Sequence, residues 1–224
     1  MKELVNRLNE ARKAYYEGES IMSDKEYDNL YDKLVKMELT TGVVLPNSPT
    51  EEVGYTVVSN LEKVKHEQKA LSLDKTKDVH FLETWLGTQD GVLSWKMDGM
   101  TVVATYENGQ LIMAATRGNG EIGENVTHNA RCIKGLPMKI RETGKVIVRG
   151  ECILSYNDFE KIKESENGEY KNPRNLCSGS VRQLNNKITK ERNVNFFAFT
   201  LVSADGVDFN NSRKCQFEWL KSQG

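Results

Sequence analysis

The chain has 224 residues, 38% hydrophobic and 28% charged, a composition typical of globular proteins and unlike that of disordered ones. Its 31 basic and 32 acidic residues leave a net charge of −1, which argues against a global basic field that binds nucleic acid unspecifically. The N-terminus is too charged for a signal peptide and no apolar run approaches membrane-spanning length, so we expect a cytoplasmic protein.

The first 50 residues are predicted to be helical. One apolar stripe recurs at spacings of three to four residues: Leu4, Leu8, Ala11 and Tyr15. Ser23 is expected to cap a second helix that ends near Glu38, with Glu26 completing a capping box. The apolar face of that helix is Tyr27, Leu30, Tyr31 and Leu34. The turn-forming stretch 45–54 then indicates a linker.

Beyond the linker the chain is rich in predicted β-strands. The β-rich runs are 91–97, 100–106, 110–116, 145–154 and 194–202. Asn108-Gly109 between two of them is a strong hairpin signal. One helix is expected over 157–164, capped by Ser155 or Asn157, and another after Pro173. The pattern therefore predicts a small helical segment followed by an α+β domain with antiparallel strands.

The stretch GNGEIG at 118–123 matches the dinucleotide-binding pattern G-x-G-x-x-G. That pattern belongs to a parallel βαβ unit, whereas the strand before GNGEIG is the second arm of the predicted hairpin. A Rossmann-type NAD oxidoreductase is therefore disfavoured.

The four cysteines provide no obvious metal or disulfide site. They contain no C-x-x-C pair and do not cluster with the three histidines. We interpret them as reduced thiols, mostly packing residues. Their positions are 132, 152, 177 and 215.

Lys96 in SWKMDGM lies in one of the β-rich runs. A lysine in an apolar strand is costly to bury charged, and desolvation that lowers its pKa would make the amine a nucleophile. The alternative is an outward-facing lysine on an alternating strand, with Asp98-Gly99 as a hairpin turn.

The sequence around Lys96 resembles that of a known family. K-x-D-G opening a hairpin is the nucleotidyltransferase signature of DNA ligases and capping enzymes. The blocks KMDG, YENGQL, AATRGNGEIGENVTHNARCIKGLP, VRGE, NPRNLCSGSVRQL and FFAF resemble, in order, the adenylation domain of NAD-dependent bacterial DNA ligases. AYYEGESIMSDKEYDNLYDKL, NSPTEEVG and HEQKALSLD resemble the N-terminal Ia subdomain and its junction.

The resemblance covers nearly the whole chain and implies its organisation. Residues 1–54 would form a helical Ia subdomain that binds the nicotinamide mononucleotide (NMN) half of NAD. Residues 55–224 would form an antiparallel-sheet nucleotidyltransferase domain with the ATP-grasp-like fold of ligase adenylation domains. The fold class is therefore α+β.

The resemblance also implies the chemistry. Lys96 would attack the α-phosphorus of NAD, release NMN and form lysyl-AMP, with NAD as adenylyl donor and Mg²⁺ as cofactor. Asp98 would orient the lysine or the ribose, and Glu151 would contact the ribose and assist metal-dependent chemistry.

The family pattern assigns further residues to the nucleotide. Arg117 would contact AMP, because a guanidinium fork suits phosphate and ribose oxygens. Phe199 would stack on adenine, with core packing as the alternative. Arg174 and Arg182 would face phosphate or DNA. The remaining residues expected around the nucleotide are Ser72, Leu73, Ser94, Met97 and Gly99.

A patch in the helical segment would hold the NMN half. Its members are Tyr15, Tyr16, Asp24, Tyr27 and Asp28. Carboxylates can accept hydrogen bonds from ribose hydroxyls and attract the cationic pyridinium ring, and aromatic rings offer stacking. The alternative is an acidic first helical turn favoured by the macrodipole, with tyrosines in a core.

The sequence departs from the family pattern in three places. Ser94 stands where the family has a glutamate that reads the adenine amino group, and the second tyrosine region is one residue shorter, which bears on the positions of Tyr15 and Tyr16. The chain also stops before a D-G-x-V-x-K strand, a further lysine motif and the DNA-binding modules. Because such lysines neutralise transition-state charge, their loss should cost orders of magnitude in rate.

Two readings follow from these departures. The first is the adenylation part of a DNA ligase, monomeric, which acts on nicked double-stranded DNA only in a full-length context. The second is a catalytically impaired module of the same lineage that binds NAD or a partner protein.

Overall fold

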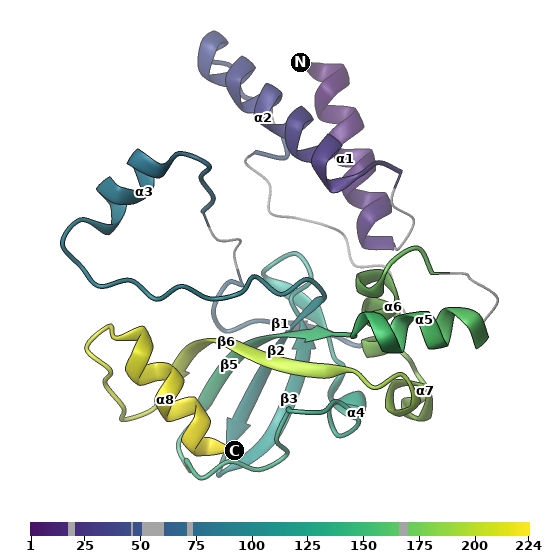
Figure 1. The fold of residues 1–224 in the computed structure, drawn as a ribbon, viewed down its shortest axis with the longest axis vertical. Helices are drawn as coiled ribbons and strands as arrows, with labels where there is room; N and C mark the ends of the chain where they lie inside the picture. The colour runs from purple at the N-terminus through teal and green to yellow at the C-terminus, as the bar shows by residue number, and fades with distance from the viewer. Residues whose placement is uncertain (18–20, 46, 51–60, 71–73, 166–169) are drawn as a thin grey trace.

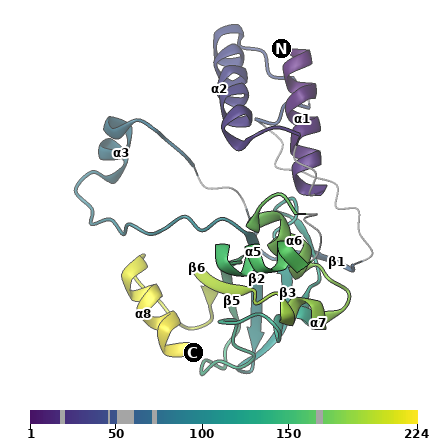
Figure 2. The same ribbon diagram turned by 45° about the vertical axis from the view of Figure 1, so that its right-hand side comes forward.

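The computed structural model describes residues 1–17, 21–45, 47–50, 61–70, 74–165 and 170–224, without the side chains of 16, 17 and 24 (Figure 1). Its N-terminal part is a pair of helices, α1 (Lys2–Glu17) and α2 (Asp24–Thr41). The rest of the described chain is a sheet with helices around it, and the helical pair stands apart from that sheet in both views (Figures 1 and 2). The predicted α+β class, helical first and antiparallel second, is confirmed.

The helical pair is held by an apolar seam. Val5 and Leu8 of α1 and Leu34 of α2 are fully buried, and the predicted apolar face of α2 packs around them. Ser23 caps α2 by accepting a hydrogen bond from the Glu26 amide at 3.2 Å. The Glu26 carboxylate binds Arg7 of α1 at 2.8 Å, so the residue that was predicted for the capping box also joins the two helices.

The first part of the predicted linker packs on α2. Ser48 and Thr50 donate hydrogen bonds from their hydroxyls to the two carboxylate oxygens of Glu38, at 2.5 and 2.7 Å. Glu38 and Ser48 are both buried. Residues 46 and 51–54 of that linker lie outside the described ranges.

The described strands of the second part form a four-stranded antiparallel sheet and a separate two-stranded one. Asn108 and Gly109 join β2 to β3 with φ of 52° and 72°, the left-handed values that a tight hairpin needs. Four of the five predicted β-runs are confirmed as strands. The order in the larger sheet is β3 (Gln110–Thr116), β2 (Met100–Glu107), β5 (Val146–Ile153) and β6 (Asn195–Ala204).

The alternation of β5 separates the two faces of this sheet. Val146, Val148 and Cys152 point into the main core. Ile147 points to the other face, where it packs with Val103 and Ala70. Helices cover the core face in Figure 1: α4 (Thr127–Ala130), α5 (Tyr156–Ser165), α6 (Pro173–Val181) and α7 (Asn186–Glu191), with α8 (Arg213–Gln223) against β6.

The second face is crossed by residues 61–70, which include β1 (Lys63–Lys65) paired with β4 (Ile122–Glu124). GNGEIG begins in the loop before β4, at residues 118–121, and ends within that strand, and Gly118 and Gly120 adopt φ of 55° and 92°. It follows a strand of an antiparallel hairpin, so the Rossmann architecture is excluded for this part of the chain.

The predicted strand over 91–97 is wrong. The segment is irregular, follows α3 (Val79–Leu86), and pairs with no neighbour among the described residues. Val92, Leu93 and Trp95 are exposed, and Trp95 is 89% accessible. A strand requires an adjacent strand to satisfy its backbone groups, which β propensity alone does not supply.

Helices at 157–164 and after Pro173 are confirmed as α5 and α6, and Ser155 caps α5 through the Asp158 amide at 3.1 Å. All four cysteines carry free thiols. None of the described helices is both long and apolar enough to cross a membrane.

Candidate active site

Glu151 on β5 is the centre of the candidate site. It lies on the face opposite the main core and is only 9% exposed. The Gly99 amide donates to Oε1 at 3.0 Å, and the Thr101 hydroxyl donates to Oε2 at 2.7 Å. Thr101 is its direct cross-strand partner on β2, so sheet register places both groups. Both carboxylate oxygens are therefore fixed by the chain just after Lys96.

Burial raises the pKa of the Glu151 carboxyl above its ordinary value. The Thr101 hydroxyl, the Arg174 cation, the Gly99 amide and the Lys96 cation each lower that pKa by a smaller amount. Two cations and two hydrogen-bond donors thus surround a carboxylate that is partly withdrawn from water.

Gly99 lies against the backbone of β5. A Cβ at this position would stand 1.9 Å from the Cys152 carbonyl oxygen, so no side chain fits. The Asp98-Gly99 stretch therefore approaches the sheet closely, although no hairpin precedes it.

Asp98 forms an ion pair with Arg174 of α6. The Arg174 guanidinium also lies over the ring of Tyr15, 4.5 Å from its centroid. Arg174 thereby joins α1, the turn after Lys96 and α6. Arg174 thus lies beside Asp98, and its role toward phosphate or DNA stays a prediction.

Lys96 is exposed and lies in the irregular segment before β2. The premise that a strand buries it is wrong, because the part of the chain that the structure describes contains no strand there. Ser94 in the same segment is also exposed, and Met97 is half-buried. The positive charge of Lys96 nevertheless lowers the pKa of the buried Glu151 carboxyl, by the smallest of the effects that oppose burial.

Arg117 follows β3 at the edge of the same face. Its amide donates to the Thr101 carbonyl at 3.0 Å, and its carbonyl is 3.1 Å from Nε2 of His66. Burial is the main reason that the pKa of His66 lies below its ordinary value, so a neutral imidazole is favoured. The glycine loop continues this anchoring, because the Ala70 amide donates to the Gly120 carbonyl at 2.7 Å.

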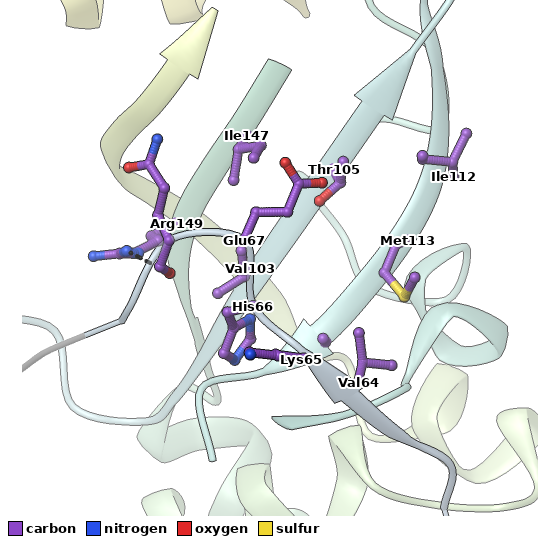
Figure 3. Close-up of a pocket in the computed structure, with 12 residues that line it drawn as sticks. Val64, Lys65, His66, Glu67, Val103, Thr105, Ile112, Met113, Ile147 and Arg149 are labelled. Atoms are coloured by element: carbon purple, nitrogen blue, oxygen red, sulfur yellow. Dashed lines mark hydrogen bonds between the residues drawn. The ribbon is translucent and has the colours of Figure 1, made fainter. Parts of the chain in front are cut away.

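Arg149 is a residue of this face that the sequence analysis missed. It stands two residues before Glu151 on β5, and its guanidinium donates to the Lys69 carbonyl at 2.9 Å. With Lys65, His66 and Glu67 it borders a small pocket of about 90 Å³ floored by Val103, Ala115 and Ile147 (Figure 3). The sequence did carry a signal for Arg149: side chains two residues apart on a strand point to the same face of the sheet, and Arg149 stands two residues before Glu151.

Two phenylalanines of β6 have exposed rings, and one of them was not predicted. Phe199 is 36% exposed and occupies a β-bulge, so it is not a core residue. Phe197, which the sequence analysis did not single out, is the direct cross-strand partner of Glu151. Either ring is accessible to a planar ligand.

Arg182 makes a different contact from Arg174. It binds the Glu124 carboxylate, with Nη2 3.1 Å from Oε1, and Glu124 is almost completely buried. The guanidinium therefore neutralises a buried acid, and the structure does not bring it together with Glu151. Ser72 and Leu73 lie outside the described residues.

The predicted NMN patch is only partly described. Tyr27 and Asp28 are half-buried on α2, and Tyr15 is half-buried on α1. Asp28 binds Lys75 at 3.0 Å. Tyr16 and Asp24 belong to α1 and α2, and their side chains lie outside the description.

No group of three or more histidine, cysteine, aspartate or glutamate residues within the described ranges is arranged to hold a metal ion. The site consists of one buried acid, flanking cations, accessible rings and a lysine amine. Such a set can bind an anionic, planar ligand such as a nucleotide.

Comparison with known proteins agrees with this chemistry. Residues 58–224 match the family model of the NAD-dependent DNA ligase adenylation domain. Residues 1–54 match that of the DNA ligase-like, N-terminal NAD⁺-binding domain.

Individual relatives are similar over the whole chain. A DNA ligase of Ruminiclostridium cellulolyticum is 58% identical over 228 residues, covering 100% of this chain and 35% of the relative. One of Lachnoclostridium phytofermentans is 54% identical, covering 99% and 35%. One of Clostridium tetani is 36% identical, covering 92% and 34%. The chain thus spans about a third of the length of these relatives.

Proposed function

Because the chain belongs to the NAD-dependent DNA ligases, we propose that it binds NAD and transfers the adenylyl group to Lys96. Lys96 loses its ammonium proton to water, the resulting neutral amine attacks the α-phosphorus, and a P–N bond forms as the nitrogen releases a second proton to water. The bond between that phosphorus and the bridging oxygen breaks, and NMN leaves with the oxygen. The product is a lysyl-AMP phosphoramidate.

The observation that carries this proposal is the fixed position of Glu151 beside the K-x-D-G turn. The Gly99 amide and the Thr101 hydroxyl hold both oxygens of the acid, while Lys96 and Arg174 contribute positive charge to it. We assign Glu151 to contact with the ribose and Asp98 to orientation of the lysine, through its ion pair with Arg174.

The other nucleotide contacts are proposed from the family pattern. Arg117 is proposed to contact AMP and Phe199 to stack on adenine, and Ser94, Met97, Ser72 and Leu73 are proposed to contact the nucleotide as well. We place the boundary between the two functional parts at residues 54 and 55, with the NMN half on the helical part. Arg182 is assigned a supporting role through Glu124 and, in a longer chain, contact with DNA phosphate.

We further propose that Mg²⁺ takes part. This ion usually keeps several waters and binds through substrate phosphates and one or two carboxylates, and Glu151 is the carboxylate that we assign to it. Its chemistry would be neutralisation of charge on the transferring phosphoryl group.

At the level of the whole protein, we propose the sealing of nicked double-stranded DNA in replication and repair, in the cytoplasm and as a monomer. The relatives that carry the name DNA ligase support this proposal, and they are about three times as long as this chain.

The test is intact-mass spectrometry of the chain after incubation with NAD and Mg²⁺. An AMP adduct that is present in the wild type and absent in Lys96→Ala is the expected result. Lys134→Ala, which removes another exposed lysine, is the control and should retain the adduct.

The failure of this test also has a meaning. Saturable NAD binding without an adduct would sink the enzymatic proposal and favour the catalytically impaired module. Sealing of nicked DNA by this chain alone would show that the longer protein is not required.

A further inference from the structure

The acidic face of α2 already binds two cations of its own chain. Asp28 and Asp32 are one turn apart on that face. Lys75 Nζ lies 3.0 Å from Asp28, and Lys77 Nζ lies 3.6 Å from Asp32. Residues 74–78, which precede α3, therefore lie along the helix and follow its charge pattern.

Lys75 makes a second contact that Lys77 lacks among the interactions described. Its ammonium is 5.3 Å from the ring centroid of Tyr31, and Tyr31 in turn stacks with Tyr27 at 6.3 Å. Lys75 thus occupies a site made of one carboxylate and one aromatic ring. A cation of either kind, ammonium or pyridinium, is favoured by that pair of groups.

This geometry points to Lys75 as a built-in competitor for the nicotinamide ring of NAD. The inference rests on the proposed function, in which Asp28 and Tyr27 hold the NMN half. The pyridinium ring of NMN carries one positive charge, as does the Lys75 ammonium. Two positive charges beside one carboxylate and its neighbouring rings repel each other, so binding of the pyridinium ring requires the lysine charge to move away.

The pair is suited to such an exchange. The Lys75 side chain is 65% exposed and that of Asp28 47% exposed, so water can solvate both groups as they separate. Exposed ion pairs and cation–π contacts are each weak, which makes the lysine a reversible occupant. Lys75 would therefore set the affinity of the helical part for oxidised nicotinamide.

The experiment compares the binding of NMN with that of its reduced form, NMNH, by calorimetry at low ionic strength. Lys75→Ala is expected to bind NMN about 3- to 10-fold more tightly than the wild type, the range for losing one weak ion pair and one weak cation–π contact. Its affinity for NMNH should stay the same, because the dihydropyridine ring has no positive charge.

Two variants control for the charge change. Lys77→Ala removes the same charge from the same segment, but its partner Asp32 lies outside the proposed NMN patch, so wild-type affinity is expected. Lys75→Arg retains a competing cation and should also resemble the wild type. The difference between Lys75→Ala and wild type should shrink as salt is raised, because exposed charges are screened.

The outcomes are distinguishable from failure of the proposed function. Equal or weaker NMN binding by Lys75→Ala, or an equal gain for NMNH, would overturn the role of Lys75 while adduct formation with NAD still stood. Absence of NMN binding in every variant, together with absence of the adduct, would overturn both.

Discussion

At the scale of single residues, Glu151 and Gly99 are interdependent. The acid needs the amide of Gly99 as a donor, and the glycine can approach only because it has no Cβ. One substitution tests the role of the Glu151 carboxyl, and a second tests the close approach of Gly99 to the sheet.

The first prediction concerns the pH dependence set by Glu151. Because its folded-state pKa is raised, the neutral form is favoured by folding, and that contribution is complete below the unfolded pKa, about 4.3. It is lost as the pH rises through the folded pKa. Glu151→Gln has no carboxyl at this position and does not lose this stabilisation as the pH rises. The free energy of unfolding of the variant should therefore increase relative to that of the wild type between pH 4 and pH 7.

Urea unfolding at both pH values measures this difference. The same variant should lose adenylyl transfer at pH 7 by about 100-fold or more if Glu151 contacts the ribose and assists the metal-dependent chemistry as proposed. A stability difference between variant and wild type that does not change with pH would contradict the assignment.

The second prediction is Gly99→Ala. Its Cβ would overlap the Cys152 carbonyl, so β2 or β5 must shift, at a cost of at least about 2–3 kcal/mol. Gly91→Ala is the matched control, since its Cβ would meet only the flexible Leu86 side chain, at 3.2 Å. Equal melting temperatures for the two variants would show that the backbone around Gly99 can move to accommodate a Cβ.

At the scale of elements, the contact between Glu38, Ser48 and Thr50 extends the helical pair beyond the end of α2. A buried carboxylate is stable only when its oxygens are hydrogen-bonded, and two hydroxyls meet that need here. The start of the linker is therefore part of the helical unit.

The third prediction follows from this contact. Ser48→Ala leaves Glu38 Oε1 without its donor and should lower the free energy of unfolding by about 1–3 kcal/mol. Thr40→Ala removes an exposed hydroxyl that bonds the Lys36 carbonyl within α2, and should change it by less than about 0.5 kcal/mol. Chemical denaturation followed by circular dichroism measures both, and equal effects would exclude a special role for Ser48.

At the scale of the whole molecule, the helical pair and the sheet are joined through side chains. Arg174 of α6 reaches both Asp98 and the Tyr15 ring, and Lys75 reaches α2. Each contact is individually weak. Weak contacts of this kind allow the helical pair and the sheet to move relative to each other. A binding site formed by both parts requires such movement.

The fourth prediction is that Arg174→Ala loosens this arrangement. Loss of an ion pair and a cation–π contact, together about 1–2 kcal/mol, should broaden the distances between the two parts and increase the radius of gyration. Small-angle X-ray scattering measures the change. Arg213→Ala, which removes a contact to Gln216 within α8, should scatter as the wild type does; identical profiles for both variants would count against the joint.

Much of the fold was predictable because it depends on local pattern. Strand periodicity located β2, β3, β5 and β6, and Asn108-Gly109 located the hairpin that excludes the Rossmann fold. Ser23 and Ser155 marked helix starts through their hydroxyls. The segment 91–97 was predicted wrongly because propensity does not supply a neighbouring strand.

The candidate site could be predicted only in part for the same reason. Motifs brought Lys96, Asp98 and Glu151 to attention. Phe197 became visible only when strand register placed it directly across from Glu151, whereas Arg149 could have been found from its position two residues before Glu151. The pairing of Arg182 with Glu124 likewise joins residues 58 positions apart.

The sequence by itself thus determined the family motifs, most element types and the antiparallel class, since these follow from side-chain order and backbone preference. Only the tertiary structure decided which charges meet: Asp98 with Arg174, Asp28 with Lys75, and Glu151 with the Gly99 amide. Electrostatic and hydrogen-bond energies depend on distance and burial, and those quantities arise only when distant segments pack together.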